Sequence, residues 1–167
     1  KQELLLPARI VPNETQLYHI HTKVEGYIEE LFVNFIGQRV SKGEPLFSVY
    51  SPELIVLQNE FIQALKTTPS SLNPNLIEAA KNRLRIQDVP ENEIIELQKT
   101  LLAKRNIVFR SPIDGFVIQK SAIHGMRVNP EMVLYDIADI STVWVITDIY
   151  EMDLPFISIG QTARLSF

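Results

Sequence analysis

Residues 24–50 read VEGYIEELFVNFIGQRVSKGEPLFSVY, and residues 113–138 read IDGFVIQKSAIHGMRVNPEMVLYDIA. The two stretches share one pattern. In the first, Gly37 is followed by apolar residues at offsets of 3, 9 and 12, and in the second Gly125 is followed by apolar residues at the same offsets. These six residues are Val40, Leu46, Val49, Val128, Leu134 and Ile137. A spacing that recurs in this way indicates an internal repeat.

Each copy of the repeat predicts two short strands joined by a glycine-bearing turn. Upstream of the turns, residues 24–28 align with residues 113–117, and both segments carry an acidic residue before a glycine. Glycine and proline in the spacer at 41–45 supply the backbone angles of tight turns. Because one such unit is too thin to bury a core, we expect the copies to pack as a pseudo-twofold β-sandwich, formed by 24–51 and 106–140.

Between the copies, the apolar spacing changes from the period of a strand to that of a helix. Ser51-Pro52-Glu53 is a helix start, and Asn73-Pro74 and Asp88-Val89-Pro90-Glu91 repeat that signal. The apolar stripes that follow contain Leu54, Leu57, Phe61 and Leu65, then Leu76, Ile77, Ala80 and Leu84, then Ile94, Leu97 and Leu101. Residues 52–105 therefore predict a helical hairpin or a short three-helix bundle, with the stripes packed mainly against one another.

The flanking segments, 1–23 and 141–167, predict one further β-module built from both ends of the chain. We expect strands at 8–10, 17–21, 142–150 and 161–167, with a short turn or half-helix at 151–157. The fold class is thus mainly β with an α-helical insert, nested as an outer β-module, a split sandwich and helices. That order predicts an elongated molecule, which suits a spacer or bridge better than a catalyst.

The composition agrees with an ordered globular protein and removes several functional classes. Apolar residues make up 46% and charged residues 22% of the chain, and the net charge is −4, which favours neither disorder nor nucleic-acid binding. Without cysteine there is no disulfide or thiolate metal site, and no apolar run has the length of a membrane span. GxSxG, HExxH, Walker and GxGxxG motifs are absent from the sequence, so we expect no enzyme and no cofactor.

Several segments of the chain resemble a known family, the periplasmic adaptors or membrane fusion proteins of resistance-nodulation-division tripartite efflux pumps. They are VEGYIEELFVNFIGQRVSKGEPLFSVYSPEL, QNEFIQALK, NRLRIQDVPENEIIEL, FRSPIDGFVIQKSAIHGMRV and IADISTVWVITDIYEMDLPFISIGQTARLSF. Together they cover nearly the whole chain. The likeness is to the heavy-metal branch, which includes copper/silver and cobalt/zinc/cadmium systems.

The resemblance implies a lipoyl-like β-sandwich, a helical hairpin at 52–105 and part of a β-barrel. It also implies an inner-membrane proton-driven pump and an outer-membrane channel as partners, self-association into a ring, and export of heavy-metal cations or drugs. The location would be the periplasm of a Gram-negative bacterium, with an inner-membrane anchor. We expect the chain to be a piece of such a protein, because the family's membrane-proximal domain and the methionine-rich segment of copper-exporting relatives are not in it.

Two alternatives to a purely structural adaptor remain. His19 and His21, separated by two, would share one face of a strand and predict a metal-ion site, as in a periplasmic metal carrier or chaperone. Two polar rings on a solvent-exposed strand explain the same spacing. A lipoylated or biotinylated carrier domain is the other alternative, although the tip where carriers place the modified lysine is here occupied by the helical insert.

Other candidate residues are predicted contacts with partners. Arg39 and Arg127 each lie two residues after the turn glycine of their copy, and we expect them to contact neighbouring protomers; two solvated arginines explain the pattern equally well. The helical loops, with Ser70 and Ser71 in one and Asp88 and Glu91 in the other, are expected to dock on the outer-membrane channel. Which loop lies farther out depends on whether the third helix folds back.

Overall fold

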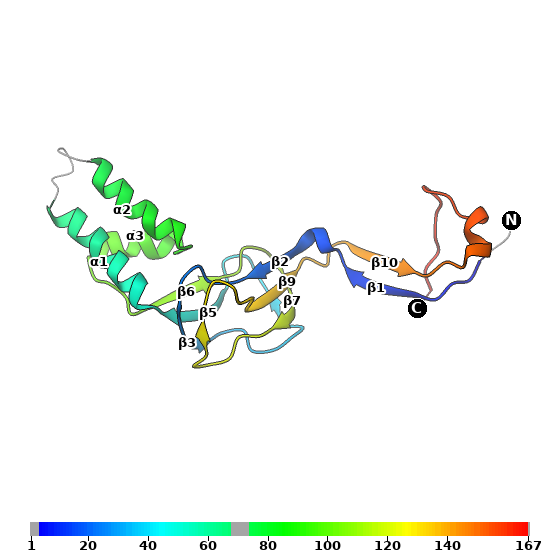
Figure 1. Cartoon of the computed structure of the whole chain (residues 1–167), viewed down its shortest axis with the longest axis horizontal. Helices are drawn as coiled ribbons and strands as arrows, with labels where there is room; N and C mark the ends of the chain where they lie inside the picture. Colours follow the sequence, from blue (N-terminus) through cyan, green and yellow to red (C-terminus); the bar gives the residue numbers. More distant parts are fainter. Residues whose placement is uncertain (1–3, 68–73, 167) are drawn as a thin grey trace.

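The computed structural model describes residues 4–67 and 74–166, and in it the chain is elongated (Figure 1). Three helices lie at one end, two four-stranded sheets lie in the middle, and a two-stranded ribbon lies at the other end, close to both ends of the described chain. The expected fold class, a mainly β protein split by a helical insert, is confirmed.

The central sandwich consists of two antiparallel sheets. One contains, in spatial order, β2 (Leu17–Ile20), β9 (Tyr135–Ala138), β7 (Gly115–Lys120) and β4 (Arg39–Val40). The other contains β6 (Asn106–Arg110), β5 (Pro45–Tyr50), β3 (Gly26–Leu31) and β8 (Arg127–Val128). Each sheet thus combines strands from both copies of the repeat.

The repeat appears in the structure as an exchange of short strands between the two copies. Gly26 of β3 lies opposite Val128 of β8, and Gly115 of β7 lies opposite Val40 of β4. These four residues hold equivalent positions in the two copies. A pseudo-twofold relation between the halves follows from this pairing.

Equivalent backbone hydrogen bonds join the two copies next to each of these strand pairs. The amide of Gly125 donates to the carbonyl oxygen of Ile28 at 2.8 Å, and the amide of Gly37 donates to that of Val117 at 2.7 Å. Both glycines have positive φ, 75° and 88°, a backbone conformation that L residues with a side chain rarely adopt. The turn glycines of the repeat are therefore required by the backbone geometry.

The predicted core residues are buried. All six apolar residues at the repeated offsets have 0% exposure: Val40, Leu46, Val49, Val128, Leu134 and Ile137. Between the sheets, the ring of Phe47 stacks on those of Phe109 and Tyr135, with centroids 5.3 and 5.7 Å apart. The Tyr135 hydroxyl donates to the carbonyl oxygen of Val33 at 2.8 Å, so the two copies are joined inside the core as well as at the edges.

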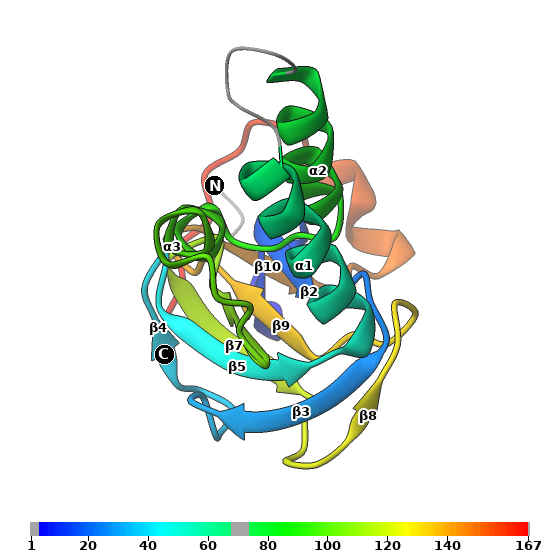
Figure 2. The ribbon, with the colours of Figure 1, turned by 90° about the vertical axis from the view of Figure 1, so that its left-hand side faces the viewer.

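The insert between the copies forms α1 (Pro52–Thr67), α2 (Pro74–Ile86) and α3 (Glu91–Thr100). Figure 2, viewed from the helical end, shows the three helices in front of the sheets. On α1, three residues of the predicted stripe, Leu54, Leu57 and Phe61, are buried, and the fourth, Leu65, is half-buried. Asn73, predicted to begin α2, lies outside the described residues.

The insert leaves and re-enters the sandwich at one place, because Tyr50 at the end of β5 lies opposite Asn106 at the start of β6. The chain can therefore run out through the helices and return without disturbing the strand order. None of the helices in the described ranges combines the length and the apolar character that crossing a membrane requires.

The outer module differs from the prediction in two places. Its strands β1 (Ala8–Pro12) and β10 (Val143–Thr147) pair with each other, and η2 (Glu151–Phe156) is the expected half-helix. Residues 17–20 were expected in this module but instead form β2 of the sandwich. There they pair with the edge of β9, and Leu17 and Ile20 become half-buried. The strand expected at 161–167 is absent from 161–166, where no neighbouring described strand continues the β1–β10 ladder.

Candidate functional site

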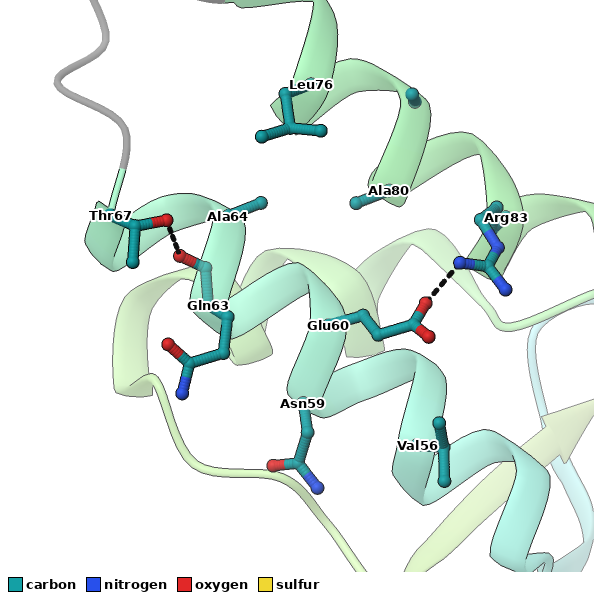
Figure 3. A pocket seen from close by; sticks show the side chains of 10 residues that line it. Val56, Asn59, Glu60, Gln63, Ala64, Thr67, Leu76, Ala80 and Arg83 are labelled. Carbon is teal, nitrogen blue, oxygen red and sulfur yellow. Dashed lines mark hydrogen bonds and ion pairs between the residues drawn. The ribbon is translucent and has the colours of Figure 1, made fainter.

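A groove of about 640 Å³ runs between α1 and α2. Half of its lining residues are apolar, namely Val56, Ala64, Leu76, Ala79 and Ala80 (Figure 3). The other half are polar or charged, namely Asn59, Glu60, Gln63, Thr67 and Arg83. Leu76, predicted to be core, is 50% exposed in this groove, and Val56 is 56% exposed. The two helices therefore leave an apolar strip that their own packing does not cover.

Small side chains give the groove its width. Ala64 of α1 and Ala80 of α2 face each other across it, and an ion pair between Glu60 and Arg83 bridges it nearer the sandwich (Figure 3). An apolar strip between two helices, flanked by polar side chains, has the form that accepts a third helix. Chemically, this surface is suited to docking.

The turn 87–91 lies beside the sandwich, and docking of Asp88 and Glu91 on the channel stays a prediction. Asp88 Oδ1 accepts a hydrogen bond from Lys23 Nζ, 3.0 Å away, just before the first strand of the repeat. Gln87 Nε2 donates to Glu53 Oε1, 3.2 Å away, at the first turn of α1. The turn lies beside the sandwich because α2 runs back from the outer end of α1 before α3 begins.

Glu91, an exposed residue at the start of α3, is held by two cations of α2. Its carboxylate lies 2.9 Å from Lys81 Nζ and 3.1 Å from Arg85 Nε. The hydrogen bond from Arg85, followed by that from Lys81, lowers the pKa of Glu91 to about 2. Ser70 and Ser71, the other predicted tip contacts, lie outside the described residues.

The two arginines of the repeat occupy equivalent strands but have different surroundings. Arg127 Nη2 lies 2.8 Å from Glu25 Oε2, and this hydrogen bond raises the pKa of Arg127. Asp114, the repeat equivalent of Glu25, instead accepts the backbone amide of Lys42 at 3.0 Å. Arg39 consequently makes no ion pair with another described residue and is exposed. Its role as a protomer contact stays a prediction.

The histidine pair lies at the edge of the sandwich. His19 of β2 is opposite Asp136 of β9, and its Nδ1 lies 2.6 Å from Asp136 Oδ1. His21 follows just after the strand and is exposed. Within residues 4–67 and 74–166 there is no group of three or more His, Cys, Asp or Glu side chains placed to hold a metal ion. A metal site at His19 and His21 stays a prediction.

Asp136 is the residue that sequence reasoning missed. The carboxylate is 12% exposed and faces His19 across two strands that are far apart in the sequence. Only the β2–β9 pairing brings them together. The available signal was the alternation in Tyr135-Asp136-Ile137, which places one polar residue between two core positions.

A family model described as "CusB, barrel-sandwich hybrid domain" matches residues 17–138. The chain belongs to this family. The matched range begins at β2 and ends with β9, so it covers both sheets of the sandwich together with the helical insert. The resemblance to heavy-metal membrane fusion proteins is confirmed at the level of the family.

Two curated proteins illustrate the relationship within the CusB barrel-sandwich hybrid family. SilB of Salmonella typhimurium is 29% identical over 140 residues, which are 84% of this chain and 32% of SilB. The cation efflux system protein CusB of Escherichia coli K12 is 27% identical over 145 residues, 87% of this chain and 35% of CusB. The chain thus spans about a third of the length of the relatives it matches.

A solved structure supports the fold of the family member described here. The crystal structure of ZneB from Cupriavidus metallidurans matches with a TM-score of 0.61 and 22% identity, over 93% of this chain and 74% of ZneB. The fold therefore extends beyond the range of the family model.

Proposed function

We propose that this chain is the sandwich and helical part of a periplasmic adaptor in a heavy-metal efflux system. The adaptor joins an inner-membrane resistance-nodulation-division pump to an outer-membrane channel. The observation that carries the proposal is the family match over residues 17–138, together with the relative CusB, a cation efflux system protein.

The arrangement of the modules supports a bridging role. Figure 1 places the helices and the β1–β10 ribbon at opposite ends of the sandwich, so that contacts at the two ends are separated by the whole molecule. We assign the ribbon end, where both described chain ends lie, to the pump side and the helices to the channel side. The protein acts by holding partners together, without a catalytic step or cofactor.

We assign the groove between α1 and α2 to a helix of the outer-membrane channel. Val56 and Leu76 supply apolar contacts, and Ala79 and Ala80 leave room for close approach. In the complete assembly we expect copies to associate as a ring in the periplasm, anchored at the inner membrane.

Cysteine cross-linking tests the groove assignment directly, because residues 1–167 contain no cysteine and a thiol introduced among them reports one position. The full-length protein carrying Ala79→Cys is expressed in a Gram-negative host with its channel and pump, and treated with a short thiol-to-amine cross-linker. We expect a covalent adaptor–channel product. Gln98→Cys, on an exposed position of α3 outside the groove, is the matched control.

A second variant asks whether the contact matters for export. Ala79→Arg inserts a long charged side chain into the groove at an exposed position, so the fold should be retained. We expect lost tolerance to copper, silver, zinc, cobalt or cadmium salts, whereas Gln98→Arg keeps it. A cross-link to the channel from position 98 but not from position 79 would refute the groove assignment. Full tolerance to these metal salts in a strain that lacks this protein would refute the efflux role.

A further inference from the structure

An alternating pattern of exposure continues past the end of β2. His19 and His21 are exposed, whereas Ile20 is half-buried and Thr22 is buried. The alternation covers residues 19–22, up to the bend at Lys23–Val24, as in the strand that precedes it. Residues two apart in an extended chain project to the same side, and both imidazoles therefore lie on the solvent side of the sandwich.

The first of these imidazoles is held by a carboxylate. Asp136 Oδ1 lies 2.6 Å from His19 Nδ1, and the His19 side chain is 57% exposed. An ionised carboxylate only accepts hydrogen bonds, so the contact requires Nδ1 to carry the proton. In neutral His19 the lone pair is then on Nε2. A carboxylate behind one ring nitrogen is the arrangement by which proteins orient histidines that bind metals.

We propose that His19 and His21 form a two-histidine site for a divalent transition-metal ion, with Asp136 as the positioning residue. Imidazole nitrogen suits Zn(II), Ni(II) and Cu(II). Two protein ligands leave coordination positions open to water or to a donor from another protein, which favours transient binding over a closed structural site. The proposal deepens the proposed efflux function by placing a contact with the cation on the sandwich.

The three histidines of the chain allow an internally controlled titration. The 167-residue chain is titrated with Zn(II) and Cu(II) in a calorimeter. The same titrations are made on the variants His19→Ala, His21→Ala and Asp136→Asn. His124→Ala is the control, because His124 lies on a separate turn. We expect one ion per chain, tighter for Cu(II), and loss of that site in either His19→Ala or His21→Ala. Asp136→Asn should weaken binding by about 10- to 100-fold, and His124→Ala should leave it unchanged.

A spectroscopic measurement separates positioning from a general structural effect. In the metal-free chain, imidazole ¹⁵N chemical shifts should identify His19 as the Nδ1–H tautomer. After Zn(II) is added, the shifts should place the ion on Nε2 of His19. In Asp136→Asn the tautomer preference should be lost, while the backbone amide spectrum should still be that of a folded protein. Absence of binding, or equal weakening by His124→Ala, would overturn the site. Unchanged affinity and tautomer in Asp136→Asn would overturn the positioning role. Cross-linking to the channel is independent of these results, so failure here leaves the adaptor role standing.

Discussion

Gln58 of α1 binds the backbone of Lys104 twice. Its Nε2 donates to the Lys104 carbonyl oxygen at 2.9 Å, and its Oε1 accepts the Lys104 amide at 2.8 Å. Gln58 is 2% exposed, so these bonds are shielded from water. They fix the segment that leads from α3 back to β6, and thereby the direction in which the helices leave the sandwich.

Removing this clamp should destabilise the protein measurably. Gln58→Ala leaves the Lys104 amide and carbonyl groups without their partner, and we expect a loss of about 2 kcal/mol in the free energy of unfolding. Urea unfolding followed by circular dichroism measures the change. Gln98→Ala, at an exposed position, should stay within about 0.5 kcal/mol of the parent chain; equal effects of the two substitutions would contradict the clamp.

The glycines that begin the first strand of each copy should be the least replaceable. A Cβ at Gly26 would lie 2.3 Å from the Tyr50 carbonyl oxygen, and one at Gly115 would lie 2.6 Å from that of Ala138. Because the obstacle is backbone, Gly26→Ala and Gly115→Ala should each cost about 3 kcal/mol or more. Gly43→Ala, whose Cβ meets open space at φ +83°, should cost only about 1 kcal/mol from left-handed strain. Thermal unfolding ranks the three, and a larger loss for Gly43→Ala would refute the clash.

The ion pairs of Glu91 predict a pH dependence of stability. Its pKa in the folded protein is about 2, below the ordinary 4.5, so the ionised carboxylate stabilises the fold above about pH 4.5 and this contribution is lost as the pH falls to about 2. The side chain is 48% exposed, and screening keeps the contribution below about 1 kcal/mol. Urea unfolding of the parent chain and Glu91→Gln should differ at pH 7 and converge near pH 2. A difference that does not change with pH would exclude the ionised group as its cause.

The arginines of the repeat should affect assembly without affecting folding. Arg39 and Arg127 are exposed, so the double alanine variant should change the free energy of unfolding by less than about 1 kcal/mol. In the full-length protein we expect it to reduce the cross-linked ladder of protomers and the tolerance to metal salts. Lys42→Ala with Lys99→Ala removes the same charge from exposed positions and is the control. If the parent protein and both double variants give the same pattern of cross-linked oligomers, the two arginines are solvated surface residues and do not contact neighbouring protomers.

The core of the sandwich could be predicted from the sequence because the same spacing occurs twice. Each buried residue of one copy, such as Val40, has its equivalent in the other, here Val128, and the turn glycines fix the register. Alternation identified residues 17–20 as a strand but did not identify its partner. Sheet membership depends on the β2–β9 pairing between residues far apart in the chain, which no local pattern encodes.

The candidate sites were harder to predict from the sequence, because they too depend on how distant segments pack. Apolar periodicity placed Leu76 in a stripe, yet periodicity cannot tell a helix face covered by its neighbour from one left open. Similarly, the helix-start signal at residues 88–91 was correct, whereas its position beside the sandwich depends on the course of α2. Asp136 became a candidate only when its partner strand was known.

The exchange of strands between the copies also sets an order of events during folding. Gly26 pairs with Val128, and Val40 with Gly115, so neither sheet can be completed until most of the chain is available. The helices need only local contacts within the insert and can form earlier. We therefore expect closure of the sandwich to be a slow, long-range step, and until it occurs the edges of β3 and β7 should remain open to pairing with other chains.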